Sequence, residues 1–239
     1  MSDPNLTSQI SHLTSKYYAI IVAGGSGSRM QSVVPKQFLL LNGIPVLMHT
    51  INAFYTCQTK PQLIVVLPPD SHAYWNELCT VHNFNIPHQL VSGGETRFHS
   101  VKNGISLIED EDAIIAVHDA VRPLVSKQTI DESYECALQY GNGIVAIKSR
   151  DSVRQIKNNR SVSLLRDEIY LIQTPQTFQS EQLKKAYQLP YNPAFTDDAS
   201  VVEQTGVNIN LISGSYQNIK ITYPEDIAIA EFLLLRESS

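Results

Sequence analysis

The chain has 239 residues and a mass of 26.7 kDa, with 43% hydrophobic and 17% charged residues. This composition is ordinary for a globular protein and excludes a largely disordered one. Lys and Arg total 18 and Asp and Glu total 23, so the formal net charge is −5. We therefore expect no nucleic-acid partner and no membrane surface as a partner.

Three widely spaced cysteines, Cys57, Cys79 and Cys136, form no CxxC pair. Their number and spacing argue against a disulfide framework or a thiolate zinc site. Residues 1–16 are polar and lack the apolar stretch of a secretory signal, so we interpret them as a flexible N-terminal extension. A cytoplasmic location is the resulting expectation.

Short apolar runs alternate with longer mixed segments along the chain. The apolar runs predict buried strands at residues 17–22, 63–67, 114–117 and 144–147. The runs are continuous rather than alternating, as in parallel strands that are covered on both faces. The mixed segments predict helices at residues 46–55, 71–82, 97–108, 129–140, 181–189, 198–205 and 224–235. This order predicts an α/β fold with a mostly parallel sheet.

Residues 149–170 interrupt this alternation. They are polar, with β-branched positions on both sides of Lys157-Asn158-Asn159, which is a turn sequence. The pattern predicts a β-hairpin that projects from the body of the domain. An isolated hairpin is marginal in water, so we expect it to pack on a partner subunit or on the body of the same chain.

A glycine-rich segment, Ala23-Gly24-Gly25-Ser26-Gly27-Ser28-Arg29-Met30, follows the first predicted strand. Such glycines allow the backbone to bend around a ligand and to direct N–H groups at phosphate oxygens. The segment lacks the Gly-Lys-Ser/Thr of a Walker loop, and Met30 stands where a dinucleotide fingerprint has its third glycine. Arg29 and Lys36 add two cations that suit a polyphosphate. The alternative is a tight strand-to-helix turn with solvated surface cations.

Two further clusters flank predicted elements. Gly93-Gly94-Glu95-Thr96-Arg97 precedes a helix that carries Ser100 in its first turn, which favours either a turn against a ligand or a helix cap. His118-Asp119-Ala120-Val121-Arg122 follows a strand, where ligands gather in open α/β sheets. Asp119 and Arg122 suit a hydroxyl, Mg²⁺ or phosphate, or they form a plain ion pair. We interpret His118 as structural, because no nucleophile lies near it in the sequence.

Three other polar clusters flank apolar runs: Gln173-Thr174-Pro175-Gln176, Thr196-Asp197-Asp198 and Asn218-Ile219-Lys220. The second is also a good N-terminal cap for the helix that follows it. Lys220 lies on a short strand-like segment between two isoleucines, and alone it would be unremarkable.

Taken in order, these segments resemble the 2-C-methyl-D-erythritol 4-phosphate cytidylyltransferase family of the non-mevalonate isoprenoid pathway. The matching stretches are AGGSGSRM, PKQFL, GGETRFHSV, HDAVRP, QTPQTF, TDDAS and NIKITYPEDIAIAE. The resemblance implies a Rossmann-like domain at residues 17–239, with a dimerisation arm at about residues 149–170. It also implies transfer of CMP from CTP to the methylerythritol phosphate, with release of pyrophosphate and with Mg²⁺ bridging the phosphates of CTP.

The same resemblance implies roles for individual residues. The expected catalytic residues are Arg29, Lys36, Lys220 and Arg166. The expected nucleotide-binding residues are Ala23, Gly24, Gly25, Ser26, Gly27, Gly94, Glu95 and Ser100. The expected substrate-binding residues are Asp119, Arg122, Ser152, Thr174 and Thr196. Ser152 and Arg166 would reach the site of the neighbouring subunit of a homodimer. No metal ligand is certain, and Asp119 is the one candidate.

Two alternatives stay open from the sequence. A ribitol-5-phosphate cytidylyltransferase shares the glycine loop, the arm and many of the motifs, and would differ near the acceptor site. A nucleotide-binding regulatory module on the same fold would bind without catalysis. Retention of Arg29, Lys36 and Lys220 together argues against the second alternative.

Overall fold

The computed structural model describes residues 16–23 and 34–237. Within them, seven strands form one sheet in the order β11-β7-β10-β6-β1-β4-β5. The strands are β1 (Tyr17–Val22), β4 (Gln62–Leu67), β5 (Gln89–Ser92), β6 (Ile114–Asp119), β7 (Asn142–Lys148), β10 (Tyr170–Gln179) and β11 (Leu211–Ser213). Only β10 runs antiparallel to its neighbours β6 and β7. The predicted mostly parallel sheet is therefore confirmed.

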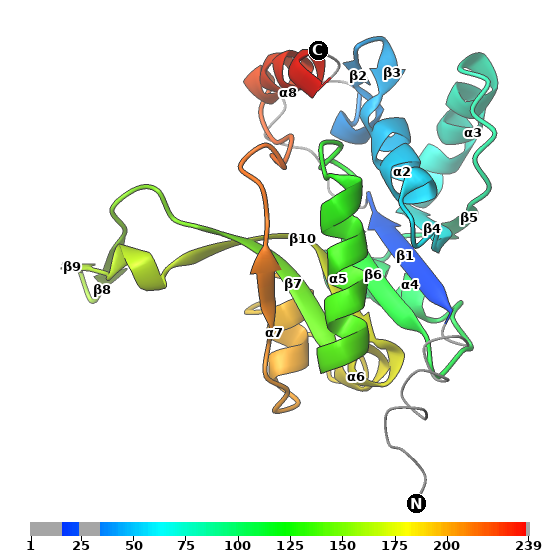
Figure 1. Cartoon of the computed structure of the whole chain (residues 1–239). Coiled ribbons are helices and arrows are strands. Elements are labelled where there is room, and N and C mark those ends of the chain that lie inside the picture. The colour runs from blue at the N-terminus through cyan, green and yellow to red at the C-terminus, as the bar shows by residue number, and fades with distance from the viewer. Residues whose placement is uncertain (1–15, 24–33, 238–239) are drawn as a thin grey trace, which may run out of the picture.

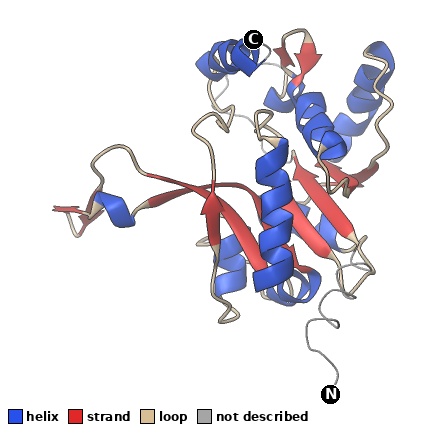
Figure 2. Ribbon diagram, in the orientation of Figure 1, coloured by secondary structure: helices blue, strands red, loops and turns tan. Residues whose placement is uncertain are grey.

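Helices cover both faces of this sheet (Figures 1 and 2). The helices of the body are α2 (Val46–Thr56), α3 (His72–Val81), α4 (Arg97–Ile105), α5 (Lys127–Tyr140), α6 (Ser180–Ala186), α7 (Asp198–Glu203) and α8 (Glu225–Glu237). Successive residues of β1 point to opposite faces, because a strand has a period of two. Ile21 packs with α2, α3 and α5 in one core, and Ile20 packs with α4, α6 and α7 in the other. The expected covering of both faces of the sheet is confirmed.

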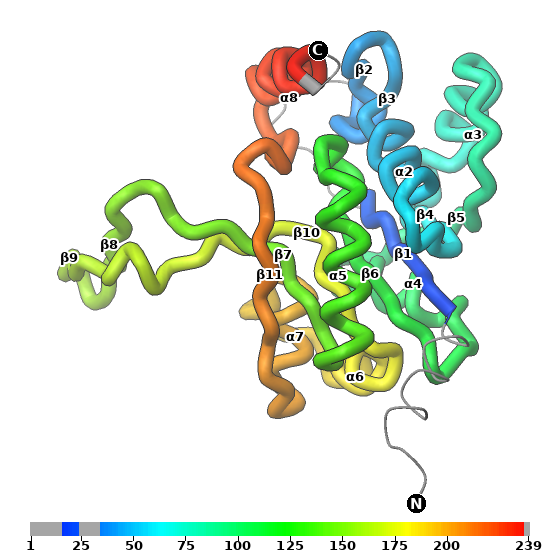
Figure 3. The backbone as a smooth tube through the Cα atoms, viewed as in Figure 1, coloured from blue at the N-terminus to red at the C-terminus, as the bar shows by residue number. Residues whose placement is uncertain are grey.

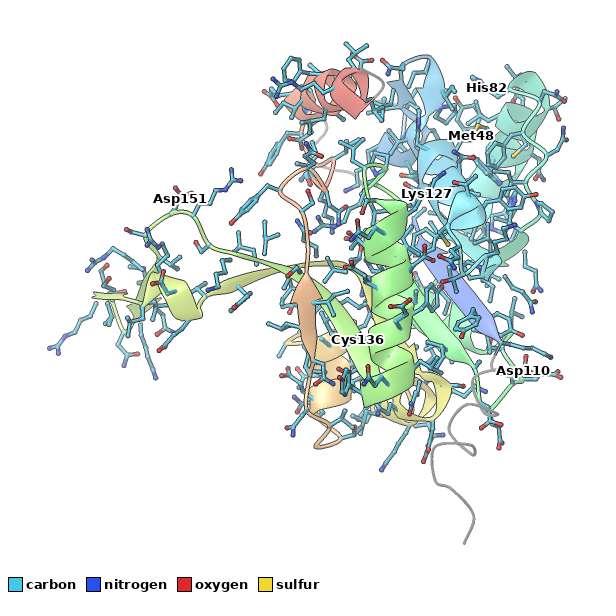
Figure 4. All side chains as sticks on the ribbon, viewed as in Figure 1. Met48, His82, Asp110, Lys127, Cys136 and Asp151 are labelled. Atoms are coloured by element: carbon cyan, nitrogen blue, oxygen red, sulfur yellow. The ribbon has the colours of Figure 1, made fainter. Side chains whose placement is uncertain are left out.

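A smaller cluster closes the end of the domain where the parallel strands finish. It joins α8 to the short hairpin of β2 (Leu40–Leu41) and β3 (Ile44–Pro45), through buried Leu41, Ile221 and Ala230. Figure 4 shows Lys127, at the start of α5, at this end of the domain, and Asp110 at the opposite end. Short 3₁₀ turns connect the main elements: η2 (Lys36–Phe38), η3 (Pro69–Ser71) and η4 (Arg166–Glu168).

The predicted hairpin is present between β7 and β10. Its strands β8 (Arg154–Lys157) and β9 (Arg160–Ser163) pair antiparallel and project far from the body (Figures 1 and 3). Asn158 and Asn159 form the turn with φ of 50° and 59°. Asn tolerates these left-handed values, and a two-residue turn of this kind matches the twist of the paired strands. We call residues 149–169 the arm.

The four predicted buried strands, the seven predicted helices and the hairpin each overlap most of an observed element. The expectation of a strand-like segment around Lys220 is wrong, because residues 218–222 form no strand. Strands β5, β10 and β11 were not among the predicted ones. β10 contains Pro175 in a cis peptide bond, and its pairing with β7 shifts between Ile172 and Gln176. Proline is compatible with a central strand at such an irregularity.

Candidate active site

The polar clusters of the sequence converge where the order of the sheet changes direction. The chain passes from β1 outward to β4 and β5, and then returns to place β6 on the other side of β1. Loops that leave β1 and β6 therefore diverge at their carboxyl ends, which is where open α/β sheets bind ligands. Ala23 follows β1 and Asp119 ends β6, so both stand at this switch point.

Two adjoining cavities open there and share Arg97, Asp119 and Lys220. The smaller, of about 120 Å³, is also lined by Val22, Ala23, Lys36, Gln37 and Val121. The larger, of about 280 Å³, is also lined by Arg122, Ile172, Gln173, Thr174, Gln176, Thr196 and Asp197. We call the first the nucleotide-side cavity, because it is lined by Ala23, the first residue of the segment expected to bind the nucleotide, and the second the acceptor-side cavity.

Asp119 is the centre of the charged groups that both cavities share. Its carboxylate lies 2.8 Å from Lys220 Nζ, 3.4 Å from Arg97 Nε and 3.6 Å from Arg122 Nε. Burial alone would raise the pKa of Asp119, but the charges of Arg97, Lys220 and Arg122 outweigh it and hold the pKa well below its usual range. Asp119 is therefore an anion that keeps three cations together.

His118 fixes the hydrogen bonds behind this group. The ring is fully buried, and burial lowers the pKa of His118 to about 4, so the ring is neutral at pH 7. Its Nε2 lies 3.1 Å from the carbonyl oxygen of Arg122, which only accepts, so Nε2 carries the proton. Its Nδ1 then accepts from the Thr174 hydroxyl at 3.0 Å, and Thr174 Oγ1 accepts from the Asp119 N–H at 3.1 Å. The interpretation of His118 as structural fits this arrangement.

Lys220 is held in place by the segment that precedes it. Asn218 is buried, and its Nδ2 donates to the carbonyl oxygen of Thr174 at 2.9 Å. Arg122 Nη1 donates to the carbonyl oxygen of Asn218 at 2.7 Å. Arg122 Nε and Asn218 Oδ1 are buried atoms with no hydrogen-bond partner among the described residues. Arg122 Nε faces the Asp119 carboxylate at 3.6 Å, so the guanidinium is held by that charge and by the carbonyl oxygen of Asn218.

The predicted nucleotide residues Gly94, Glu95 and Ser100 lie together at the start of α4. Gly94 N–H donates to Ser100 Oγ at 3.1 Å, and Ser100 Oγ donates to the carbonyl oxygen of Thr96 at 2.9 Å. A Cβ at Gly94 would lie 2.4 Å from His99 Cβ, so only glycine fits this turn. Thr96 caps α4. The helix cap, one of the two alternatives from the sequence, is therefore present, and contact of this turn with a ligand stays a prediction.

The structure brings seven of the predicted site residues to the two cavities, and it leaves Gly94, Glu95, Ser100 and the arm residues outside their lining. Of the predicted residues, those that line the two cavities are Ala23, Lys36, Asp119, Arg122, Thr174, Thr196 and Lys220. Ser152 and Arg166 are exposed on the arm, where Arg166 pairs only with Asp167 among the described residues. Figure 4 shows Asp151, the neighbour of Ser152, well to one side of the body. Gly24, Gly25, Ser26, Gly27 and Arg29 lie outside the described residues.

Five polar residues that line the cavities are not among the predicted site residues. Arg97 lines both cavities, Gln37 lines the nucleotide side, and Gln173, Gln176 and Asp197 line the acceptor side. Gln176 Nε2 donates to Asp197 Oδ2 at 3.0 Å, which joins β10 to the start of α7. Arg97 belongs to the same short motif as Gly94 and Glu95, and a cation beside those residues was the available signal.

The site does not contain a set of magnesium ligands in the part of the chain that the structure describes. Asp119 is the only predicted candidate, and its carboxylate is occupied by Lys220 and two guanidinium groups. No group of three or more His, Cys, Asp or Glu lies within reach of one metal ion among these residues. Residues 24–33 contain no carboxylate. The described residues of the site therefore form no cage of protein ligands for a resident Mg²⁺.

Among the described residues, no helix is both long and apolar enough to cross a membrane.

The sheet order and the cation-rich cavities at its switch point define a Rossmann-like α/β domain that binds a phosphorylated ligand. The family model of 2-C-methyl-D-erythritol 4-phosphate cytidylyltransferase (IspD) matches residues 17–236, so the chain belongs to this family. The protein of that name from Phocaeicola vulgatus is 46% identical over 217 residues, covering 91% of this chain and 99% of that protein.

Solved structures agree with this assignment. The crystal structure of the Francisella tularensis 2-C-methyl-D-erythritol 4-phosphate cytidylyltransferase is 34% identical, with a TM-score of 0.75 over 91% of this chain and 99% of that chain. The 4-diphosphocytidyl-2C-methyl-D-erythritol synthase of Anaerococcus prevotii is 26% identical, with a TM-score of 0.80 over 98% of this chain and 100% of that chain.

Proposed function

We propose that this chain transfers CMP from CTP to 2-C-methyl-D-erythritol 4-phosphate, giving 4-diphosphocytidyl-2-C-methyl-D-erythritol and pyrophosphate, for the biosynthesis of isoprenoid precursors. The observation that carries the proposal is the pair of cavities that share Arg97, Asp119 and Lys220. Two phosphorylated substrates that react with each other need adjoining sites and cations between them. The proposed location is the cytoplasm, as expected from the sequence.

The proposed reaction needs no general base from the protein. A phosphate monoester is largely ionised at neutral pH, and one of its oxygens attacks the α-phosphorus of CTP. The bond from that phosphorus to the bridging oxygen of pyrophosphate breaks, and pyrophosphate leaves with the electron pair. The protein aligns the two substrates and stabilises the charge that develops on the transferring group. His118 is not a base in this scheme, because both of its ring nitrogens are engaged within the protein.

The proposed roles follow the two cavities. Lys36 on the nucleotide side and Lys220 on the shared wall face the phosphates of CTP, together with Arg29 of the glycine-rich segment. The Arg122 guanidinium, which lines the acceptor-side cavity, would pair with the phosphate of the acceptor. The Thr174 hydroxyl donates its only hydrogen bond to His118 Nδ1, so the remaining lone pair of Thr174 Oγ1 can accept a hydrogen bond from a hydroxyl group of the polyol. Gly94, Glu95 and Ser100 would contact the cytidine. We propose that Mg²⁺ enters with CTP as part of that substrate.

Pyrophosphate release tests the proposal directly. The assay contains CTP and Mg²⁺ with either 2-C-methyl-D-erythritol 4-phosphate or ribitol 5-phosphate, and it is repeated with each substrate alone. We expect release that depends on the methylerythritol substrate. Efficient release with ribitol 5-phosphate, and none with the methylerythritol substrate, would show that the chain is a ribitol-5-phosphate cytidylyltransferase instead. CTP binding without release under any of these conditions would support the non-catalytic module.

We also propose that two copies associate through the arm and that Ser152 and Arg166 complete the site of the neighbouring subunit. The support is exposed apolar surface on the arm, where the side chains of Ile156, Val162 and Leu165 are 69%, 51% and 70% exposed. A short two-stranded hairpin with such residues is marginal alone and gains stability from a partner.

Mixed dimers test the shared site. An Arg166→Ala subunit keeps an intact body, and a Lys220→Ala subunit keeps an intact arm. Mixing the two inactive variants should restore one intact composite site in each heterodimer. Proven exchange of subunits without any recovery of turnover contradicts a site that is shared across the dimer.

A further inference from the structure

Arg97 occupies a special position, because its side chain lies in the wall that separates the two cavities. The residue opens α4, and its side chain is 30% exposed. Its Nε donates to Asp119 at 3.4 Å, while Nη1 and Nη2 donate to the two oxygens of Asp198 at 2.9 Å and 2.6 Å. Three of the five N–H groups of Arg97 are thus used by carboxylates, and two remain for a ligand.

Asp198 holds Arg97 from a position outside the cavities. Its side chain is fully buried, and its Oδ1 also accepts from the Tyr187 hydroxyl at 2.6 Å. Tyr187 stacks on Phe98, the neighbour of Arg97, with ring centroids 4.7 Å apart. Neither Asp198 nor Tyr187 is among the described residues that line the two cavities. We call Asp198 and Tyr187 the Arg97 clamp.

The backbone under the clamp is also fixed. Asp198 is the first residue of α7, whose start is closed by a capping box between Asp197 and Ser200. The N–H of Ala199 donates to Gln176 Oε1 at 2.8 Å, which ties the helix to β10. A bidentate Arg–carboxylate pair on such a support fixes the plane of the guanidinium as well as its position. Replacing a buried ion pair by apolar residues is often neutral or stabilising. A contribution to stability therefore does not by itself explain the pairing of Arg97 with Asp198.

We propose that Asp198 and Tyr187 are positioning residues that fix the Arg97 guanidinium between the two cavities, with its remaining N–H groups available to the phosphoryl oxygens of both substrates. The proposal rests on the proposed function for the identity of those substrates. Through Nε, the same guanidinium also orients Asp119, which holds Lys220. The clamp therefore sets the geometry of two cations at the shared wall.

Asp198→Asn is the central variant. The asparagine keeps one oxygen for the Tyr187 hydroxyl and Nη1, but its NH₂ group opposes the Nη2 donor, so the bidentate pair is lost. We expect kcat to fall about tenfold to a hundredfold and the KM of both substrates to rise. Tyr187→Phe removes one supporting bond and leaves the pair intact, so a loss of about twofold to fivefold is expected.

A double-mutant cycle separates positioning from folding. Arg97→Lys keeps the charge and loses the fork that Asp198 holds. In that background, Asp198→Asn should cost less than about threefold in kcat/KM, because the clamp has no fork to orient. The matched control is Val202→Ala, which removes buried volume from α7 and no group that can hydrogen-bond to Arg97, and it should leave kcat per folded molecule unchanged. An equal loss from Asp198→Asn in both backgrounds overturns the proposal.

A measurement made without turnover tests the positioning of Arg97 independently of the proposed function. The Nε–H resonance of Arg97 in an NMR spectrum should exchange slowly with solvent in the unmodified chain and rapidly in Asp198→Asn, with no substrate present. Equal exchange in the two proteins overturns the clamp. If the unmodified chain transfers no CMP and this difference in exchange is still observed, the proposed function fails while the positioning of Arg97 stands.

Discussion

The buried neutral ring of His118 makes the stability of this protein depend on pH in a defined direction. Burial lowers the pKa of His118 from 6.5 to about 4. Between about pH 6.5 and pH 4, His118 is therefore protonated in the unfolded chain and neutral in the folded chain. The contribution to stability is complete above about pH 6.5 and is lost as the pH falls from 6.5 towards 4.

The size of the effect follows from that shift. The full loss is about 3 kcal/mol, and about 2 kcal/mol of it falls between about pH 7 and about pH 5. Urea unfolding at several pH values measures the free energy, and His118→Asn removes the titrating ring while keeping an oxygen near the Thr174 hydroxyl. The variant is less stable at pH 7, but its free energy should decline less steeply towards pH 5. Identical slopes in the two proteins would refute the burial argument.

Three other changes test separate parts of the account. Lys220→Ala removes a cation that both cavities share, so kcat/KM should fall about a hundredfold or more, while a shift in thermal midpoint as large as that of a core mutation would point to a structural role instead. Gly94→Ala places a Cβ against His99, so the KM for CTP should rise severalfold in steady-state assays; an unchanged KM removes Gly94 from the nucleotide site. Asn159→Val strains the left-handed turn of the arm and should weaken dimerisation in sedimentation experiments, whereas Asn159→Gly should not; equal dissociation constants contradict the role of the arm.

The elements that the sequence predicted well are those with a strong local signal. Residues 63–67 are a continuous apolar run, and β4 is buried on both faces of the sheet. The arm was placed by its turn, because two consecutive asparagines tolerate the positive φ that a tight hairpin requires. In both cases the physical cause of the structure lies within a few residues.

β10 was missed because its signal is not local. Gln173, Thr174 and Gln176 are polar, yet they are buried within a central strand. Their burial is possible because distant groups satisfy them, as Asn218 does for the carbonyl oxygen of Thr174 and Asp197 does for Gln176. Nothing in the sequence of residues 173–176 reveals those partners.

The same limit applies to the site. The resemblance located Asp119, Arg122, Thr174, Thr196 and Lys220, and the structure brings all of them to one cavity. It did not indicate the pairing of Arg97 with Asp198, which are 101 residues apart in the chain. Residues that line the site occur in short motifs that can be recognised in the sequence. Asp198, which holds Arg97 in place, is brought to it only by the folding of the chain.

The most direct test of the central claim follows the oxygen atoms of the acceptor. 2-C-methyl-D-erythritol 4-phosphate labelled with ¹⁸O in its phosphate is incubated with the chain, CTP and Mg²⁺, and the products are analysed by mass spectrometry and ³¹P NMR. If the acceptor phosphate attacks the α-phosphorus, all of the label stays in the cytidylylated product, with labelled oxygen in the new bridge between the two phosphorus atoms, and pyrophosphate is unlabelled. Label in pyrophosphate, or an unlabelled bridge, would contradict attack by the acceptor phosphate on the α-phosphorus of CTP.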